Sequence, residues 1–275
     1  MSNFGRHNHF SRRQGAALML MLTMLVIGAA ALLVSSLSRS AAQLDRDQKS
    51  ADVLSFAKQA LIGDAVSQAP VASAGYLRLP DLGFQIGLTP SEGSAAPNFS
   101  GNSKNFSVIG KLPWRTLGLE PLRDGQGECL WYLVSGYFKN TPVTDALNWD
   151  TPGQINLADG SGNVIASNLA AVVIATGYKL DGQTRALSDP AYVQCGGNYD
   201  AQNYLDPYTS SNAVSGAINY FSGSTNNRVA PGTANNLLVM GGSTHYNDRF
   251  LPITTDEILG WSYVAPIFPF KFQHC

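Results

Sequence analysis

The sequence predicts an α+β protein. A long amino-terminal α-helix, transmembrane in its first half and amphipathic in its second, carries a β-rich carboxy-terminal globular head. Three observations support this prediction: an uncharged apolar run near the amino terminus, helical spacing of apolar residues directly after it, and several later segments with strand composition. A chain of 275 residues is long enough to bury a core in such a head.

The first half of the helix is an apolar run that follows a short basic segment. No charged residue occurs between Arg13 and Arg39, and residues 16–34 are almost purely Ala, Leu, Met, Val and Ile. At about 1.5 Å per helical residue, the 25 uncharged residues reach roughly 37 Å, which is enough to span a bilayer. Arg6, Arg12 and Arg13 place the amino terminus in the cytoplasm by the positive-inside rule.

The helical pattern continues beyond the apolar run. Residues 37–62 contain no Gly and no Pro, and charged residues stand between apolar ones at helical spacing. The apolar residues in this pattern are Leu37, Leu44, Ala51, Leu54, Ala57 and Leu61. Gly63 is a natural end, because glycine readily takes the left-handed conformation found after helices. We therefore expect one helix over residues 16–63, a length that a simple membrane anchor does not need.

The junction between the basic segment and the apolar run resembles a known processing signal. Its residues are Arg12-Arg13-Gln14-Gly15, followed at once by Ala16-Ala17-Leu18-Met19-Leu20-Met21-Leu22. This pattern is similar to the class III signal of type IV pilins and type II secretion pseudopilins. The resemblance implies that residues 1–15 are a leader, that a prepilin peptidase cuts after Gly15, and that the new terminal residue Ala16 is N-methylated.

The resemblance also implies what the helix does after processing. It would be retained in the inner membrane, with its amino terminus in the cytoplasm, and would then enter a filament in the periplasm or at the cell surface. Its partners would be the inner-membrane assembly platform and other pilins or pseudopilins. The residues implied in the filament core are Ala16, Ala17, Leu18, Leu20, Leu22 and Leu25.

Leu20 departs from the family pattern, in which the fifth residue after the cut is usually Glu. A carboxylate within a bilayer is costly unless a partner neutralises it, and in this family the partner is thought to be the terminal amine of a neighbouring subunit. Certain minor pseudopilins at the filament tip lack this Glu. The resemblance therefore implies a minor pilin or pseudopilin that initiates assembly or presents its head for binding.

Two other fates of the amino terminus remain open. An uncleaved signal anchor would hold a periplasmic binding or enzymatic domain at the membrane. Ordinary signal peptidase cleavage would follow the small residues Ser40-Ala41-Ala42, although the apolar run is long for a secretory signal.

The remaining sequence predicts a connection and a head. Residues 64–104 contain four prolines among many Ser, Gly and Ala, which predicts a loop or linker before a head over residues 105–275. Strand composition occurs at Leu130–Phe138, on both sides of Asp159-Gly160-Ser161-Gly162, and at Leu237–Met240. Ala170–Ala175 is continuously apolar, as a strand buried on both faces would be. Thr254 and Glu257 have capping-box spacing, which predicts a short helix.

The three cysteines, Cys129, Cys195 and Cys275, have no metal-binding spacing. In an exported head we expect one disulfide. We favour Cys195–Cys275, because it would hold the carboxy-terminal residue and because Cys129 lies in an apolar strand pattern typical of a buried thiol. Cys129 is the alternative partner.

The sequence predicts no enzyme and no nucleic-acid binding. It contains no G-x-S-x-G, P-loop or H-E-x-x-H motif, and only His245 and His274 lie beyond the leader. Gly241-Gly242-Ser243-Thr244-His245, with Asp248 nearby, reads as a polar loop, since catalytic triads usually combine separate elements. Residues 16–275 hold 15 basic and 19 acidic residues, so there is no basic surface for nucleic acid.

No cofactor is predicted, with calcium as the alternative at two loops. Asp159, Ser161 and Asn163 have the alternating oxygen ligands of a calcium loop, but position 170 is Ala where an EF-hand has an acidic ligand. A hairpin turn is the preferred interpretation there. The loop Asp200–Asp206 is the second calcium candidate.

Overall fold

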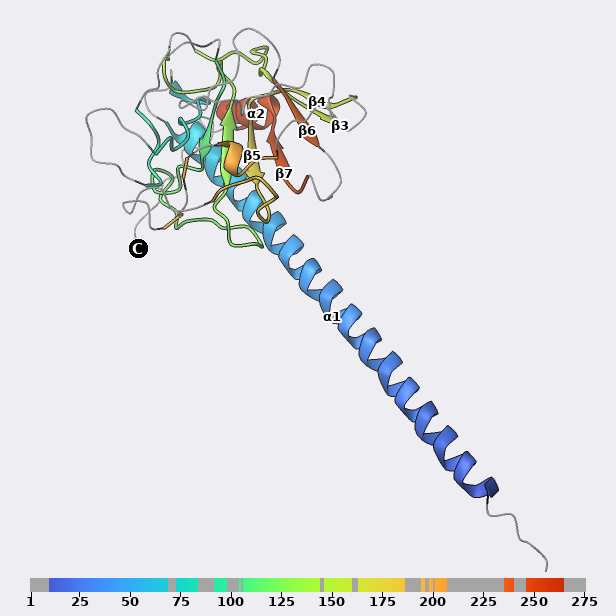
Figure 1. Cartoon of the computed structure of the whole chain (residues 1–275). Helices are drawn as coiled ribbons and strands as arrows, with labels where there is room; N and C mark the ends of the chain where they lie inside the picture. Colours follow the sequence, from blue (N-terminus) through green and yellow to red (C-terminus); the bar gives the residue numbers. More distant parts are fainter. Residues whose placement is uncertain are drawn as a thin grey trace, which may run out of the picture. The chain divides into compact units, whose positions relative to one another are not determined.

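The computed structural model describes residues 10–68, 73–83, 92–97, 104, 106–143, 146–159, 163–185, 194–195, 198–199, 201–206, 235–239 and 246–264. The chain divides into two compact units, Met1–Asp47 and Gln48–Cys275. A long amino-terminal helix and a separate β-sheet region make the protein α+β, as the sequence predicts (Figure 1).

Helix α1 runs from Phe10 to Ser67 and passes from the first unit into the second. In the first unit, every side chain from Ala17 to Arg46 is exposed. In the second unit, one face of the helix is buried at intervals of three and four residues; its members are Leu54, Ala57, Leu61 and Ala65. This spacing places them on one side of the helix, where they enter the core of the head.

The predicted end of the helix at Gly63 is wrong, because α1 continues to Ser67. Leu61 and Ala65, on either side of Gly63, are 1% and 0% exposed. Their burial favours continuing the helix, and it outweighs a glycine cost of about 1 kcal/mol.

A four-stranded antiparallel sheet forms the centre of the head. Its strands are β1 (Val108–Lys111), β2 (Trp131–Val134), β5 (Ala171–Ala175) and β7 (Arg249–Ile253), in the order β1-β2-β5-β7. Both faces are covered. Along β2, Tyr132 and Val134 pack on the side of α1, while Trp131 and Leu133 pack on the opposite side. The prediction that residues 170–175 form a strand buried on both faces is confirmed for residues 171–175.

A second sheet covers the face of the central sheet away from α1. It contains β4 (Val164–Leu169), β3 (Ile155–Asp159) and β6 (Asn235–Val239) in that order, with β3 antiparallel to β4 and parallel to β6 (Figure 1). Ile155 and Leu157 of β3 pack against Trp131 and Ile174 of the central sheet. The two strands predicted on either side of residues 159–162 and the strand predicted near Leu237 are therefore present.

Helix α2 (Thr255–Val264) begins at the predicted capping box. The Thr254 hydroxyl accepts a hydrogen bond from the Glu257 amide at 3.2 Å, and the Glu257 carboxylate accepts one from the Thr254 amide at 2.8 Å. Ile258 is fully buried in the core that also contains Leu54 of α1. The amino-terminal part of α2 therefore packs onto the same side of the central sheet as α1.

The segment predicted as a connection contributes to the core of the head. Tyr76, Leu77 and Leu79 are fully buried. Leu77 pairs with Lys139, and Asp81 pairs with Lys111 at the outer edge of β1. Strands β1 and β7 were not predicted from the sequence, and the strand predicted over Leu130–Phe138 ends at Val134.

Candidate functional site

The amino-terminal half of α1 contains the residues for which the sequence predicts processing and filament packing. The backbone is helical through Gly15 and Ala16, and the side chain of Ala16 lies outside the described ones. The described candidates Leu18, Leu20, Leu22 and Leu25 are between 57% and 71% exposed. These four residues therefore belong to one continuous apolar helix surface, and the structure shows no tighter cluster among them.

This half of α1 satisfies its own polar groups. The Ser35 hydroxyl donates to the carbonyl of Ala31 at 2.7 Å, and the Ser38 hydroxyl donates to the carbonyl of Val34 at 2.9 Å. The Thr23 hydroxyl bonds to the Leu20 carbonyl in the same way. A helix whose hydroxyls bond within the helix can lie in lipid without unpaired polar groups. In the described part of the chain, one helix is long and apolar enough to cross a membrane, and it is α1.

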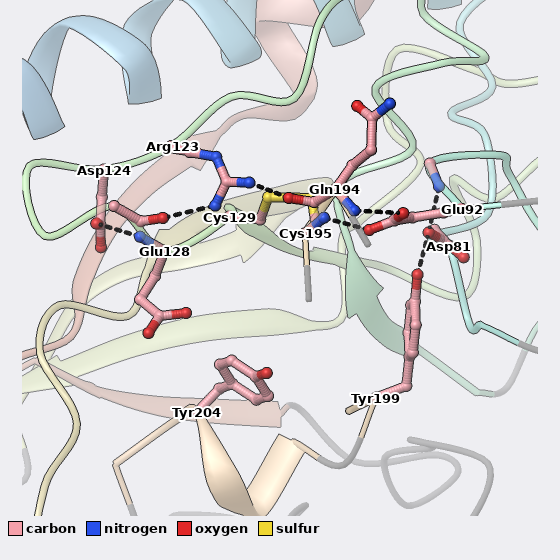
Figure 2. Close-up of a disulfide and its surroundings, with 12 residues drawn as sticks. Asp81, Glu92, Arg123, Asp124, Glu128, Cys129, Gln194, Cys195, Tyr199 and Tyr204 are labelled. Carbon is pink, nitrogen blue, oxygen red and sulfur yellow. Dashed lines mark hydrogen bonds between the residues drawn. A yellow bond between two sulfur atoms is a disulfide. The ribbon is translucent and has the colours of Figure 1, made fainter. Parts of the chain in front are cut away.

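The head contains a disulfide between Cys129 and Cys195, which corrects the pairing favoured from the sequence (Figure 2). Cys129 lies just before β2, in a bridge with Arg123, so it is not a thiol inside a strand. The Cα atoms of the two cysteines are 5.5 Å apart, and both side chains are buried beside Trp114. Cys275 lies outside the described residues. With Cys129 and Cys195 bonded to each other, Cys275 has no other cysteine in its chain to pair with.

A buried carboxylate holds the Cys195 side of the disulfide. Glu92 is 5% exposed and accepts the main-chain amides of Gln194, at 2.9 Å, and of Cys195. From the other side, the Arg123 guanidinium donates to the carbonyls of Gln194 and Gly127 (Figure 2). Charged groups from two distant segments therefore fix the loop at Gln194 and Cys195.

A second carboxylate, Asp81, lies next to this loop and is 3% exposed. It accepts hydrogen bonds from the amides of Gly83 and Gly93, at 2.9 and 2.7 Å, and from the Tyr199 hydroxyl at 2.8 Å. Burial raises the pKa of Asp81 to about 6, although these hydrogen bonds and the charge of Lys111 act in the opposite direction.

Lys111 at the end of β1 is also buried, at 2% exposure. Its ammonium lies 4.4 Å from the centre of the Tyr199 ring and 5.2 Å from that of the Tyr204 ring. Burial lowers the pKa of Lys111 to about 8, partly offset by the charge of Asp81. A lysine with a lowered pKa is a feature of some catalytic sites. Here its burial under aromatic rings is better suited to holding the Tyr199 and Tyr204 segments against β1.

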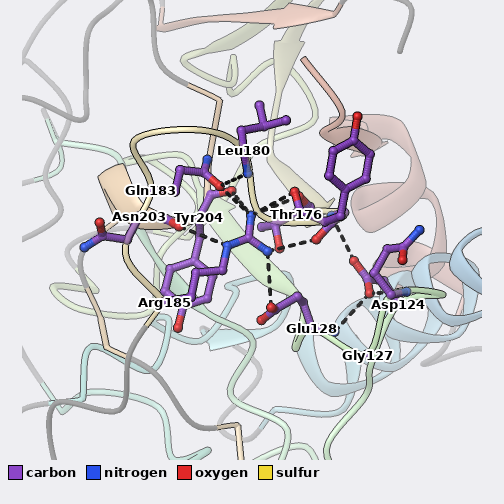
Figure 3. Close-up of polar contacts among 12 residues, drawn as sticks. Asp124, Gly127, Glu128, Thr176, Leu180, Gln183, Arg185, Asn203 and Tyr204 are labelled. Atoms are coloured by element: carbon purple, nitrogen blue, oxygen red, sulfur yellow. Dashed lines mark hydrogen bonds and ion pairs between the residues drawn. The ribbon is translucent and has the colours of Figure 1, made fainter. Parts of the chain in front are cut away.

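Arg185 is the centre of a third polar cluster (Figure 3). Its guanidinium donates to the carbonyls of Gly177, Asn203 and Tyr204 at 2.8, 3.0 and 3.1 Å. It also pairs with Glu128 at 3.3 Å. One buried cation therefore joins the segment after β5, the short helix η2 (Ala201–Asn203) and the turn before Cys129. Sequence reasoning missed Arg185 and Glu92, because nothing in the local pattern indicates that either charge is buried.

The calcium candidates are described only in part. The side chain of Asp159, together with Ser161 and Asp200, lies outside the described residues, and Asn163 is exposed. Asp206 accepts the amides of Asn247 and Asp248, at 2.5 and 2.8 Å, and its own amide donates to Asp248 at 2.8 Å. The described residues contain no group of three or more His, Cys, Asp or Glu that could hold a metal ion.

The residues of the polar loop that could suggest a hydrolase site are also described only in part. Residues 241–245 and His274 lie outside the described residues, whereas Asp248 is described. Burial, together with the charge of Asp206, raises the pKa of Asp248 well above its usual range. The hydrogen bonds of Asp248 join the chain before β7 to residue 206, which is a structural role.

No protein-family model, curated protein or solved structure matches this chain. Any functional conclusion therefore depends on the residues and the geometry described above.

Proposed function

We propose that this protein is a minor pilin or pseudopilin, a structural subunit at or near the tip of a type IV pilus-like or type II secretion filament. The observation that carries the proposal is the continuity of α1. One helix of 58 residues has an exposed apolar first part and, without interruption, a second part buried in the head. An anchor has no need of a helix that continues into the domain that it holds, whereas a filament subunit uses one continuous helix both to contact its neighbours and to carry its head.

In this proposal the exposed apolar residues of α1 contact lipid before assembly and neighbouring subunits after it. The prepilin peptidase removes residues 1–15, Ala16 becomes the methylated terminus, and the assembly platform moves the subunit out of the inner membrane. Side chains that are more than half exposed at Leu18, Leu20, Leu22 and Leu25 suit this exchange of one apolar environment for another.

Two features of the head support an extracytoplasmic location and a tip position. A disulfide is stable in the oxidising periplasm and rare in the cytoplasm. The compact unit Gln48–Cys275 is large, and a large head is accommodated most easily where no further subunit stands above it. Leu20 fits the same position, because the first subunit of a filament finds no neighbouring amine to neutralise a Glu.

Amino-terminal processing tests the proposal. Intact-mass analysis of the membrane-derived protein should give a chain that begins with methylated Ala16. Gly15→Val should leave the leader attached, because the peptidase site accepts a residue with almost no side chain. Gly5→Val makes the same change within the leader and should be processed normally.

Two outcomes would contradict the proposal. A chain that begins at Met1 would identify an uncleaved signal anchor holding a periplasmic binding or enzymatic domain. A chain that begins at Gln43 would identify ordinary signal peptidase cleavage, and most of the exposed apolar part of α1 would then be absent from the mature protein.

A further inference from the structure

Two carboxyl groups of the head, those of Asp206 and Asp248, are bonded to each other's main chain. Asp206 ends the segment 201–206 that begins with η2, and Asp248 stands directly before β7. The Asp206 carboxylate accepts the amides of Asn247 and Asp248, and the Asp248 carboxylate accepts the amide of Asp206. These reciprocal hydrogen bonds hold the two carboxyl groups close together.

Both carboxyl groups are buried. Asp206 is 7% exposed, and the Oδ1 atom of Asp248 is shielded from solvent. Among the residues that the structure describes, none donates a hydrogen bond to this Oδ1 atom. A buried, ionised oxygen that accepts no hydrogen bond is costly, whereas a protonated carboxyl is uncharged and its O–H can donate. The surroundings therefore favour a proton on Asp248.

The neighbouring charges act in the same direction. Burial is the largest cause of the raised pKa of Asp248, and the charges of Asp206 and Asp124 add to it. The Arg185 guanidinium opposes them, but it also pairs with Glu128 at 3.3 Å (Figure 3). Carboxylates from three segments therefore outnumber the one cation near Asp248.

We propose that Asp206 and Asp248 hold a single proton between them and form a pH-sensitive switch that joins the segment 201–206 to the start of β7. Asp206 accepts two amides and Asp248 accepts one, so Asp206 is the better stabilised anion and Asp248 carries the proton. The Asp248 O–H can then donate to the neighbouring Asp206 carboxylate, as in other close carboxyl pairs. Loss of the proton leaves two adjacent anions in the interior, and their repulsion separates the two segments.

The switch acts on a segment that packs against the central sheet. Tyr204 and Leu205 are buried in the same cluster as Trp131 of β2, and the ring centres of Tyr204 and Trp131 are 5.2 Å apart. Asp206 comes next in the chain, so its hydrogen bonds hold one end of this packed segment. The inference goes beyond the proposed function and does not depend on it, because the pair lies entirely in the head.

A bound cation is the other way to neutralise two carboxylates. A hard divalent cation takes six or more oxygen ligands, and the described residues contain no third His, Cys, Asp or Glu that could complete such a site. Arg185 already places a positive charge near Asp248, which disfavours a second cation there. These observations favour the proton.

Amide hydrogen exchange of the full-length protein in detergent tests the switch. The folded state binds the proton more tightly than the open state, so the pair stabilises the closed contact in acid and loses this effect as the pH rises. Between about pH 4 and pH 8, the protection factors of the amides of Asp206, Asn247 and Asp248 should fall at least about tenfold relative to those of β2. An unchanged ratio would overturn the proposal.

Variants assign the effect to the pair. They are made in an Asp81→Asn background, because Asp81 titrates in the same range. Asp248→Asn keeps an oxygen acceptor and places a neutral donor where the protonated acid stands, so it should abolish the relative fall. Asp206→Asn should do the same, and it serves if the first variant does not fold. Asp181→Asn removes an exposed carboxylate and should keep the full effect.

Two results with these proteins would contradict the proposal. A relative fall of equal size in Asp248→Asn and Asp181→Asn would show that other groups cause it. Protection that is restored at about pH 8 by about 1 mM calcium, and lost again with a chelator, would show that the pair holds a cation instead of a proton.

Discussion

Replacing Cys129 by serine tests how far the disulfide stabilises the head. The bond joins residues 66 apart in the sequence. In the chain-entropy model, closing a loop of this length stabilises the folded state by about 4 kcal/mol. Domains of this kind are stable by only about 5–15 kcal/mol, so this one bond contributes a large share of the free energy of unfolding.

The measurement is urea unfolding of the full-length protein in detergent, followed by tryptophan fluorescence. Trp131 is fully buried, and Trp114 packs beside the disulfide, so both report on the head. With an m-value of about 3 kcal/mol per molar urea, Cys129→Ser should lower the midpoint by more than about 1 M. The substitution is made in a Cys275→Ser background, so that Cys195 cannot form a non-native bond.

Cys275→Ser alone is the control, and it should leave the midpoint unchanged. A shift smaller than about 0.3 M for Cys129→Ser would show that the loop-closure argument does not apply to this bond. A large shift for Cys275→Ser, or peptide mapping to Cys195–Cys275, would refute the pairing itself.

Three further predictions follow from single residues. Leu20→Glu should leave the head folded, with an unchanged urea midpoint, but should reduce filament initiation. Improved assembly of this variant would count against the tip position. Gold labelling of the protein along the whole shaft, or an abundance of the protein equal to that of a major subunit, would also count against it. Gly93→Ala should destabilise the head by about 1–3 kcal/mol, because Gly93 has a φ of +79° and an added Cβ would lie 2.2 Å from the Trp114 ring; an unchanged midpoint would contradict this. Burial raises the pKa of Asp81 from 3.8 to about 6, so the folded state binds this proton more tightly than the unfolded state, and about 2 kcal/mol of stability present at pH 4 should be lost as the pH rises to 7. Asp81→Asn should remove this part of the pH dependence of the urea midpoint, and an identical pH profile in the two proteins would refute the assignment.

The elements predicted correctly are those with strong local signals. Helix α1 follows from an uninterrupted helical pattern, α2 from the capping box at Thr254, and β3 and β4 from the turn residues between them. β7 was missed because it contains Pro252, which argues against a strand and is tolerated here because β7 is an edge strand. β1 has only four residues, too few to show a period.

The candidate sites likewise fall into those that a local motif identifies and those that depend on contacts between distant segments. The processing residues Gly15 and Ala16 form a linear motif, so they can be identified without a fold, and their processing remains a prediction. The partner of Cys195 could not be derived locally. Three cysteines allow three pairings, and the choice depends on which side chains the folded chain brings to within bonding distance. The burial of Glu92, Lys111 and Arg185 could likewise not be predicted from the sequence, since charged residues are normally exposed.

The sequence by itself therefore determined the long helix, its apolar first part and the strand-rich composition of the head, because helical period, capping and turn chemistry act between residues close together in the chain. Only the tertiary structure decided that α1 continues through Gly63, that Cys129 bonds to Cys195, and that the segment containing Leu77 and Asp81 belongs to the core. These outcomes depend on burial and on contacts between segments far apart in sequence. In each of them the free energy of packing outweighs the local preference that the sequence displays.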